Sequence, residues 1–132
     1  MKYLGVDYGS SYIGLAMADS DSKMALPFDT VRENDLNKQL AVIEQIVLDE
    51  DIDFIVVGYP LTLDGGESEQ SAETISFITA LGGKLSIPVE KEDERLTSKF
   101  AQTLIREADG AGGHDDHALA ASSILQTYID RQ

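Results

Sequence analysis

Acidic residues from distant parts of the chain could together hold a divalent cation. The candidates are Asp7, Asp93, Glu94, Asp115 and Asp116. Carboxylates that share a site repel one another, and their oxygens are the ligands that hard divalent cations prefer. Asp7 directly follows the apolar run 3–6, and Gly9 allows a tight turn that leaves this carboxylate uncovered. If the fold gathers these acids, they predict a site for divalent cations.

Three of these acids also have an ordinary structural explanation. An aspartate beside a glycine is a common turn residue, which would account for Asp7 alone. Acidic residues in the first turn of a helix complement the helix dipole, which would account for Asp115 and Asp116. Only a metal site needs the acids to meet. The elements that carry the acids therefore decide between the two explanations.

The first half of the chain predicts a strand meander followed by a helix and a strand. Strands are expected near residues 2–7, 12–19 and 24–31, joined by short turns that suit antiparallel pairing. Apolar residues recur at helical spacing over 36–47, which predicts a helix. The continuous apolar run 54–57 then indicates a buried, parallel strand.

The second half predicts three helices and one more strand. A helix with apolar positions at 72, 75 and 78 is expected to end at Gly82 and Gly83. The segment 85–89 is expected to form a short strand, which Pro88 places at an edge. Thr97 can cap a further helix, and residues 118–128 carry the apolar face of a last one.

The order βββαβαβαα predicts a ribonuclease-H-like fold, an α/β fold with a mixed five-stranded sheet and helices on both faces. In this order the ends of the first and the later parallel strands converge at one edge of the sheet. Asp7 ends the first strand, Asp93 and Glu94 follow the last, and Asp115 and Asp116 begin the final helix. The fold therefore predicts that the acids meet there.

Composition predicts one domain, residues 1–132, with a strongly acidic surface. The chain has 24 acidic and 10 basic residues, for a net charge of −14, and no cysteine. It shows no signal peptide and no membrane-spanning run, so we expect a soluble, cytoplasmic protein with no membrane partner. The charge argues against a polyanionic partner, yet Arg95, Lys99 and Arg106 share a face if their segment is helical. These three could form a local basic stripe or an ordinary solvated helix face.

The chain resembles the YqgF/RuvX family, whose members are assigned to Holliday-junction resolution and to pre-16S rRNA maturation. The resemblance covers nearly the whole chain and rests on five strings in the family's order: 5–9, 57–61, 64–65, 93–97 and 120–128. It implies a metal-dependent nuclease that hydrolyses phosphodiester bonds, in 5′-end maturation of pre-16S rRNA or on branched DNA. The cofactor would be Mg²⁺ or Mn²⁺, and the partners nucleic acid and ribosomal proteins. The family's acids fall on Asp7 and Glu94, with Arg95 beside them.

The third acid of the family pattern is displaced in this chain. Counting back from residues 124–126, the family aspartate falls on His117, whereas Asp116 lies one residue earlier. The string 114–120 also resembles the closing motif of the related RuvC resolvases, in which histidine can replace an aspartate ligand. We favour Asp116 as the third catalytic and metal-binding residue, because Mg²⁺ and Mn²⁺ prefer oxygen, and keep His117 as the second choice.

Such a site needs no histidine base or serine nucleophile. Two divalent ions ~4 Å apart can hold an attacking water and a leaving oxygen on opposite sides of the phosphorus atom. Arg95, Lys99 and Arg106 would then contact the phosphates of the substrate, although Arg95 could equally pair with its acidic neighbours.

Two other classes of protein share parts of this pattern. The first motif also resembles the phosphate-binding turn of actin-like ATPases and sugar kinases, but those proteins clamp nucleotide between two such domains. A catalytically idle binding module of the same fold is the second alternative, supported by the charge and the displaced acid. The sequence does not choose between an RNA and a DNA substrate, or between a monomer and a homodimer.

Overall fold

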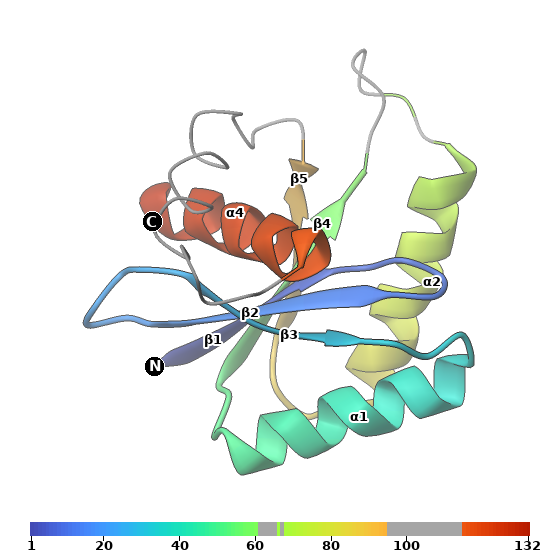
Figure 1. Ribbon diagram of the computed structural model, residues 1–132, viewed down its shortest axis with the longest axis horizontal. Helices are drawn as coiled ribbons and strands as arrows, with labels where there is room; N and C mark the ends of the chain where they lie inside the picture. Colours follow the sequence, from blue (N-terminus) through green and yellow to red (C-terminus); the bar gives the residue numbers. More distant parts are fainter. Residues whose placement is uncertain (61–65, 67, 95–114) are drawn as a thin grey trace.

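One mixed β-sheet organises the chain, with strand order β3-β2-β1-β4-β5 (Figure 1). The structure is a computed structural model that describes residues 1–60, 66, 68–94 and 115–132. The first three strands pair antiparallel, and β4 pairs parallel with both β1 and β5. This sheet confirms the predicted ribonuclease-H-like topology. The strands are β1 (Lys2–Asp7), β2 (Ile13–Asp19), β3 (Leu26–Val31), β4 (Phe54–Tyr59) and β5 (Val89–Asp93).

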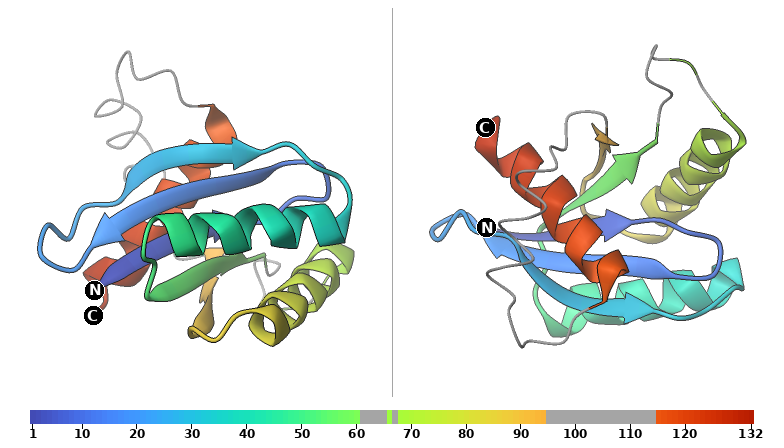
Figure 2. Two further views of the ribbon diagram at one scale, coloured as in Figure 1. Left: turned by 90° about the horizontal axis from the view of Figure 1, so that it is seen from below. Right: turned by 45° about the horizontal axis from the view of Figure 1, so that its top comes forward.

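Helices cover both faces of the sheet, as predicted. α1 (Leu36–Asp49) and α2 (Glu69–Lys84) lie on one face, and α4 (Asp116–Asp130) crosses the other (Figure 2). Each of the three begins at a side chain that accepts a hydrogen bond from a backbone N–H of the first turn, as N-caps do. The caps are Asp35, Ser68 and Asp115. The helix expected after Thr97 lies outside the described residues.

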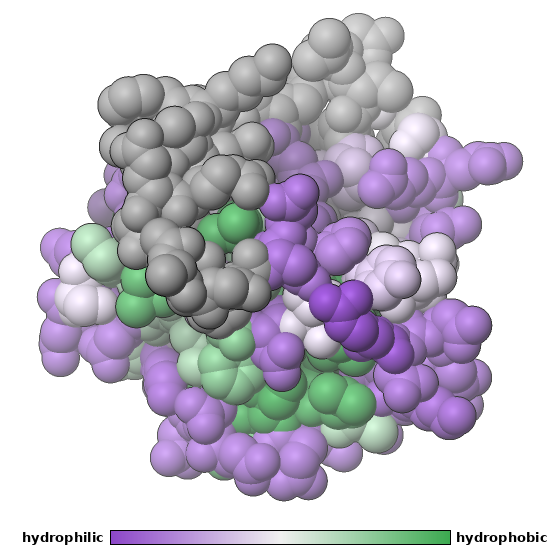
Figure 3. Space-filling model, in the orientation of Figure 1, coloured by the Kyte–Doolittle hydropathy of each residue, from purple (hydrophilic) through white to green (hydrophobic). Residues whose placement is uncertain are grey.

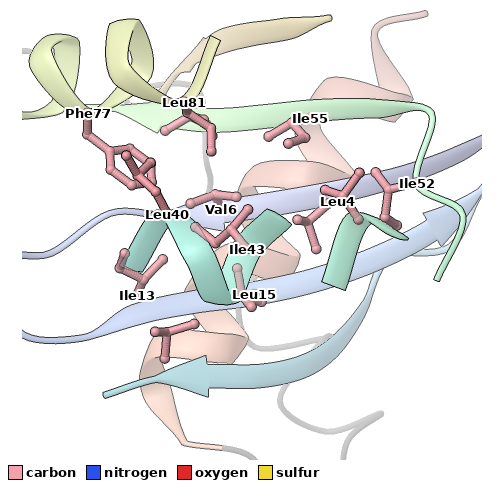
Figure 4. Close-up of a cluster of buried hydrophobic side chains, with 13 residues drawn as sticks. Leu4, Val6, Ile13, Leu15, Leu40, Ile43, Ile52, Ile55, Phe77 and Leu81 are labelled. Carbon is pink, nitrogen blue, oxygen red and sulfur yellow. The ribbon is translucent and has the colours of Figure 1, made fainter. Parts of the chain in front are cut away.

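The two faces of the sheet are packed in different ways. The face under α1 and α2 is filled by large aliphatic side chains and Phe77 (Figure 4). The face under α4 carries several alanines and glycines together with Val56, Tyr3 and Phe54, and α4 packs Ile124 and Leu125 against it. Small residues on the sheet let a helix backbone approach closely. α4 therefore lies nearer to the strands than side chains of ordinary size would allow.

The last strand lies four residues later than predicted. We expected 85–89, whereas β5 is Val89–Asp93. The prediction was wrong because the two glycines near residue 82 do not end α2, which continues to Lys84 and needs the next four residues to turn back to the sheet. Pro88 still precedes an edge strand, as expected, and its carbonyl accepts a hydrogen bond from the Ile55 N–H at 3.0 Å.

The shift changes the placement of the acids that follow this strand. Asp93 is paired with Tyr59 as the last residue of β5, and Glu94 comes directly after it. Glu94 thus stands at the end of an edge strand, while Asp7 is the last residue of β1. Both acids lie at the carboxyl ends of parallel strands.

The described surface is largely hydrophilic, in keeping with the acidic composition. Polar residues dominate the described part of the face in Figure 3, with smaller apolar areas between them. None of the helices formed by the described residues is long and apolar enough to cross a membrane.

Candidate active site

The carboxyl groups of Asp7 and Glu94 meet and are joined by a side-chain hydrogen bond. Their strands are not neighbours, because β4 lies between β1 and β5. Gly58 of β4 provides the room: a Cβ at this position would lie 3.0 Å from Oε1 of Glu94. A side chain there would crowd the space through which Glu94 reaches Asp7. The glycine of the string 57–61 therefore has a physical role in forming the acid pair.

The shared environment alters the protonation of both acids. Burial raises the pKa of Glu94 to about 8, with further contributions from the charge of Asp7, the hydrogen bond to Asp7 and the charge of Asp93. Burial also raises the pKa of Asp7, although the hydrogen bond from Glu94 and the nearby His117 oppose that rise. Near neutral pH, Glu94 thus keeps its proton and donates it to Asp7. A carboxyl pair that shares one proton is a common arrangement in active sites.

Three candidate residues, 115–117, lie at the start of α4, and each has a different environment. Asp115 is the N-cap: it accepts hydrogen bonds from the Ala118 N–H at 3.2 Å and from Oγ1 of Thr30 at 2.6 Å. It also forms an ion pair with Arg32 at 2.6 Å. Burial acts to raise its pKa, but the contacts with Thr30, Ala118 and Arg32 hold the pKa below its usual value. The structural role considered for Asp115 from the sequence is thus the one the structure shows.

Asp116 and His117 occupy different environments although they are neighbours. Asp116 is exposed at the first position of α4. His117 is half-buried and lines a cavity of about 470 Å³ together with Asp7, and it lies near enough for its charge to lower the pKa of that acid. The structure therefore brings His117, our second choice, to the acid pair. The rest of the described lining comes from residues 8–12 and Gln70.

Two loops beside the acid pair are tied together by a buried glutamine. The side-chain amide of Gln39 donates hydrogen bonds to the carbonyl of Ser10 at 3.2 Å and to that of Glu33 at 2.7 Å. Gln39 is 2 % exposed. Fixed in this way, the loops border a second cavity of about 330 Å³, lined by Ser11, Tyr12 and residues 32–34. Sequence reasoning missed Gln39, although a polar residue among apolar positions of a helix is a usable signal.

The residues of the predicted basic stripe, Arg95, Lys99 and Arg106, lie outside the described residues, as does most of the loop 61–67. Lys91, which precedes the stripe, is described: its ammonium lies 4.6 Å from the ring centre of Tyr59. Within the described ranges, no three histidine, aspartate or glutamate side chains form a ready-made metal site. The acid pair with nearby His117 is thus the part of the predicted site that the structure assembles.

Resolvases are among the solved structures of similar fold. RuvC from Thermus thermophilus matches 96% of this chain and 92% of its own, with a TM-score of 0.69 and 14% identity. The fowlpox virus resolvase, solved with Holliday-junction DNA, matches 99% of this chain and 98% of its own, with a TM-score of 0.58 and 12% identity. The class defined by the fold is that of ribonuclease-H-like proteins.

Sequence comparison identifies the family. The family described as "RuvX: Holliday junction resolvase" matches residues 1–131, and the chain belongs to this family of nucleases. A relative from Anaeromyxobacter dehalogenans is 38% identical, covering all of this chain and 98% of its own length. A relative from Syntrophus aciditrophicus is 37% identical, covering 98% of this chain and 89% of its own. Both relatives carry the name "Putative pre-16S rRNA nuclease".

Proposed function

We propose that this protein is a metal-dependent endonuclease that cleaves precursor 16S rRNA near its 5′ end. The observation that carries the proposal is the contact between the carboxyl groups of Asp7 and Glu94 at the ends of β1 and β5. The chain's membership of the RuvX family and the name of its relatives support the reaction class and the substrate. RNA of this kind would be met in the cytoplasm, where ribosomal proteins are further expected partners.

The residues of the site fit a hard divalent cation. Asp7 and Glu94 offer carboxylate oxygens, and their crowding is relieved once a cation replaces the shared proton. A site of two carboxylates is sufficient in this class of reaction, since Mg²⁺ is usually held by one or two carboxylates together with substrate phosphates. His117 is placed to contribute a nitrogen, which favours Mn²⁺ over Mg²⁺. Asp116 remains the candidate from the sequence, and its substitution tests that role.

A bound cation would activate a water molecule and stabilise the charge that develops on the phosphate. The chain's own residues prepare this chemistry. Glu94 holds a proton against Asp7 until both carboxylates are needed as ligands, and Gly58 keeps the space between them open. Gln39 fixes the loop that borders the cavity, so that the turn after β1 is held in place before substrate arrives.

A nucleic-acid substrate must approach this site against electrostatic repulsion from an acidic protein. A net charge of −14 opposes the approach of any nucleic acid. A cation held between Asp7 and Glu94 would bridge the protein to a phosphate, and the stripe Arg95, Lys99 and Arg106 would add local contacts. Binding should therefore require divalent metal, and added salt should first screen the repulsion before it weakens the contacts.

Cleavage assays with the purified protein test the proposal. A 5′-labelled precursor 16S rRNA fragment should be cut only with Mn²⁺ or Mg²⁺, and Asp7→Asn and Glu94→Gln should each abolish cutting. Asp116→Asn and His117→Ala, compared side by side, show which residue serves the site. Cutting at wild-type rates by Asp7→Asn and Glu94→Gln would overturn the proposal.

Resolution of Holliday junctions is the second candidate function, favoured by the description of the matching family. A four-way DNA junction, incubated in parallel with the RNA, distinguishes the two. A junction cutter needs two active sites related by symmetry, so that activity should come with a homodimer in sedimentation experiments. Anisotropy that shows no binding of either nucleic acid at any metal concentration would instead support an idle module of the same fold.

A further inference from the structure

The imidazole of His117 lies flat against an aromatic ring from another part of the fold. The rings of His117 and Tyr12 are stacked, with centroids 4.9 Å apart and planes 17° apart. Tyr12 comes from the turn between β1 and β2, whereas His117 belongs to the first turn of α4. Both residues line the cavity that also contains Asp7. The stack thus links the turn after Asp7 to the helix that approaches it.

Arg32 braces this stack from a third segment. Its guanidinium lies 5.4 Å from the ring centre of Tyr12. The same guanidinium forms the 2.6 Å ion pair with Asp115, which caps α4 two residues before His117. Tyr12 is therefore contacted by both a cation and an imidazole, and the cation is itself anchored to the helix that carries the imidazole.

Tyr12 has no comparable role in the core. Its side chain is 43 % exposed, and it is absent from both clusters of buried residues. Its described ring contacts are with His117 and Arg32. An exposed tyrosine that orders two polar groups beside an acid pair is better explained by the site than by folding.

We propose that Tyr12 is a positioning residue, which holds the His117 imidazole toward Asp7 so that it can serve a divalent cation bound by the acid pair. This inference rests on the proposed function. Residues that orient the ligands of a metal without touching it commonly change affinity 10- to 100-fold when they are replaced. Arg32 contributes by holding the Tyr12 ring and the start of α4 together.

Titration of the metal-free protein with Mn²⁺ tests the inference, with binding followed by the electron paramagnetic resonance signal of the free ion. Tyr12→Leu should weaken Mn²⁺ binding by about 10-fold. Tyr12→Phe keeps the stacked ring and should bind as the wild type does. Arg32→Met should weaken binding by a smaller factor. An unchanged Kd in Tyr12→Leu would overturn the inference.

A double-mutant cycle separates positioning from general stability. If Tyr12 acts through the imidazole, Tyr12→Leu should have no further effect on Mn²⁺ binding in a protein that already carries His117→Ala. Equal effects of Tyr12→Leu in both backgrounds would contradict the inference. Asp7→Asn tests the proposed function separately: loss of Mn²⁺ binding in this variant, with Tyr12→Leu unaffected, would leave the metal site standing and remove only the role of Tyr12.

Nuclear magnetic resonance provides a readout that needs no metal. The chain has only two histidines, so their ring C–H resonances are easily assigned with a His114→Ala variant. Stacking on Tyr12 shifts the His117 resonances through the ring current. Tyr12→Leu should remove this shift and Tyr12→Phe should preserve it. Identical His117 resonances in the wild type and Tyr12→Leu would show that the ring does not hold the imidazole.

Discussion

The carbonyl oxygen of His117 lies directly over Gly14, so closely that a Cβ on this glycine would be 1.8 Å from the oxygen. Gly14 is also the register partner of Asp7 in the β1–β2 pair. The same glycine therefore sets how near α4 comes to the sheet and where along the sheet this happens. The first turn of α4 therefore contacts the sheet next to Asp7, which explains why His117 reaches the cavity.

Gly14→Ala should destabilise the protein by about 3 kcal/mol or more, because the new methyl group meets backbone that cannot rotate away. Gly83→Ala is the matched control: nothing lies within 4 Å of a Cβ there, and the residue is inside α2. It should stabilise the protein by about 0.5–1 kcal/mol. Urea unfolding measures both. A Gly14→Ala variant as stable as the wild type would show that α4 is not held at this distance.

The stability of the metal-free protein should fall as pH rises from about 4.5 to about 8. Glu94 has a pKa of about 8 in the folded protein against 4.5 in the reference state, so the folded state holds a proton that the unfolded chain has released. Glu94→Gln, which resembles the protonated acid, should lose this dependence and be the more stable protein at pH 8. Unfolding curves at several pH values test this prediction, and parallel pH profiles for the two proteins would refute it.

Asp7→Asn should separate activity from stability. The substitution removes one of two crowded carboxylates, so the metal-free protein should be as stable as the wild type or slightly more stable at pH 8, while RNA cleavage is lost. Thermal melts and cleavage assays on one preparation give both quantities. Strong destabilisation would mean that Asp7 mainly anchors the turn after β1.

Asp115→Ala should cost more stability than the loss of an ordinary helix cap. Asp35→Ala at the start of α1 is the comparison, since Asp35 accepts one backbone hydrogen bond from Lys38 at 3.0 Å. That loss should cost about 1 kcal/mol. Asp115 also accepts hydrogen bonds from Thr30 and Arg32, so Asp115→Ala should lower the free energy of unfolding by about 2 kcal/mol. Equal costs in chemical denaturation would indicate that the contacts to Thr30 and Arg32 add nothing.

His117→Asp should shift the metal preference from Mn²⁺ toward Mg²⁺. An oxygen ligand then replaces a nitrogen ligand beside two carboxylates, and Mg²⁺ strongly prefers oxygen. Competition between the two ions for the metal-free protein gives the ratio of their Kd values. The same ratio in the wild type and the variant would place His117 outside the coordination of the metal.

The sequence predicted the acid pair because the predicted order of strands and helices places Asp7 and Glu94 at the same edge of the sheet. Asp7 ends an apolar run, and even the misplaced last strand left Glu94 at the same edge of the sheet. β5 itself was missed because four of its five residues are charged and carry no apolar signal. The choice between Asp116 and His117 could not be made from spacing, since it depends on how α4 rests on Gly14.

The packing around Tyr12 was also beyond sequence reasoning. Its stack with His117 and its contact with Arg32 join three segments that are distant in the chain. Turn residues carry no periodicity, so neither partner could be inferred from pattern. The basic stripe at Arg95, Lys99 and Arg106 stays a prediction, which Lys99→Glu with Arg106→Glu would test by weakening RNA binding for all sequences.

The uneven packing of the sheet has a consequence during synthesis. Chains emerge from the ribosome amino-terminus first, so β1, β2 and α1 are available long before α4. Until α4 arrives, the face that it will cover stays open to water. That face presents Gly5, Gly14 and Ala16, but it also presents Val56 and the rings of Tyr3 and Phe54, which other chains can contact until α4 covers them. The carboxyl-terminal helix is thus the element that buries this apolar surface, and the same step brings His117 to the cavity that Asp7 lines.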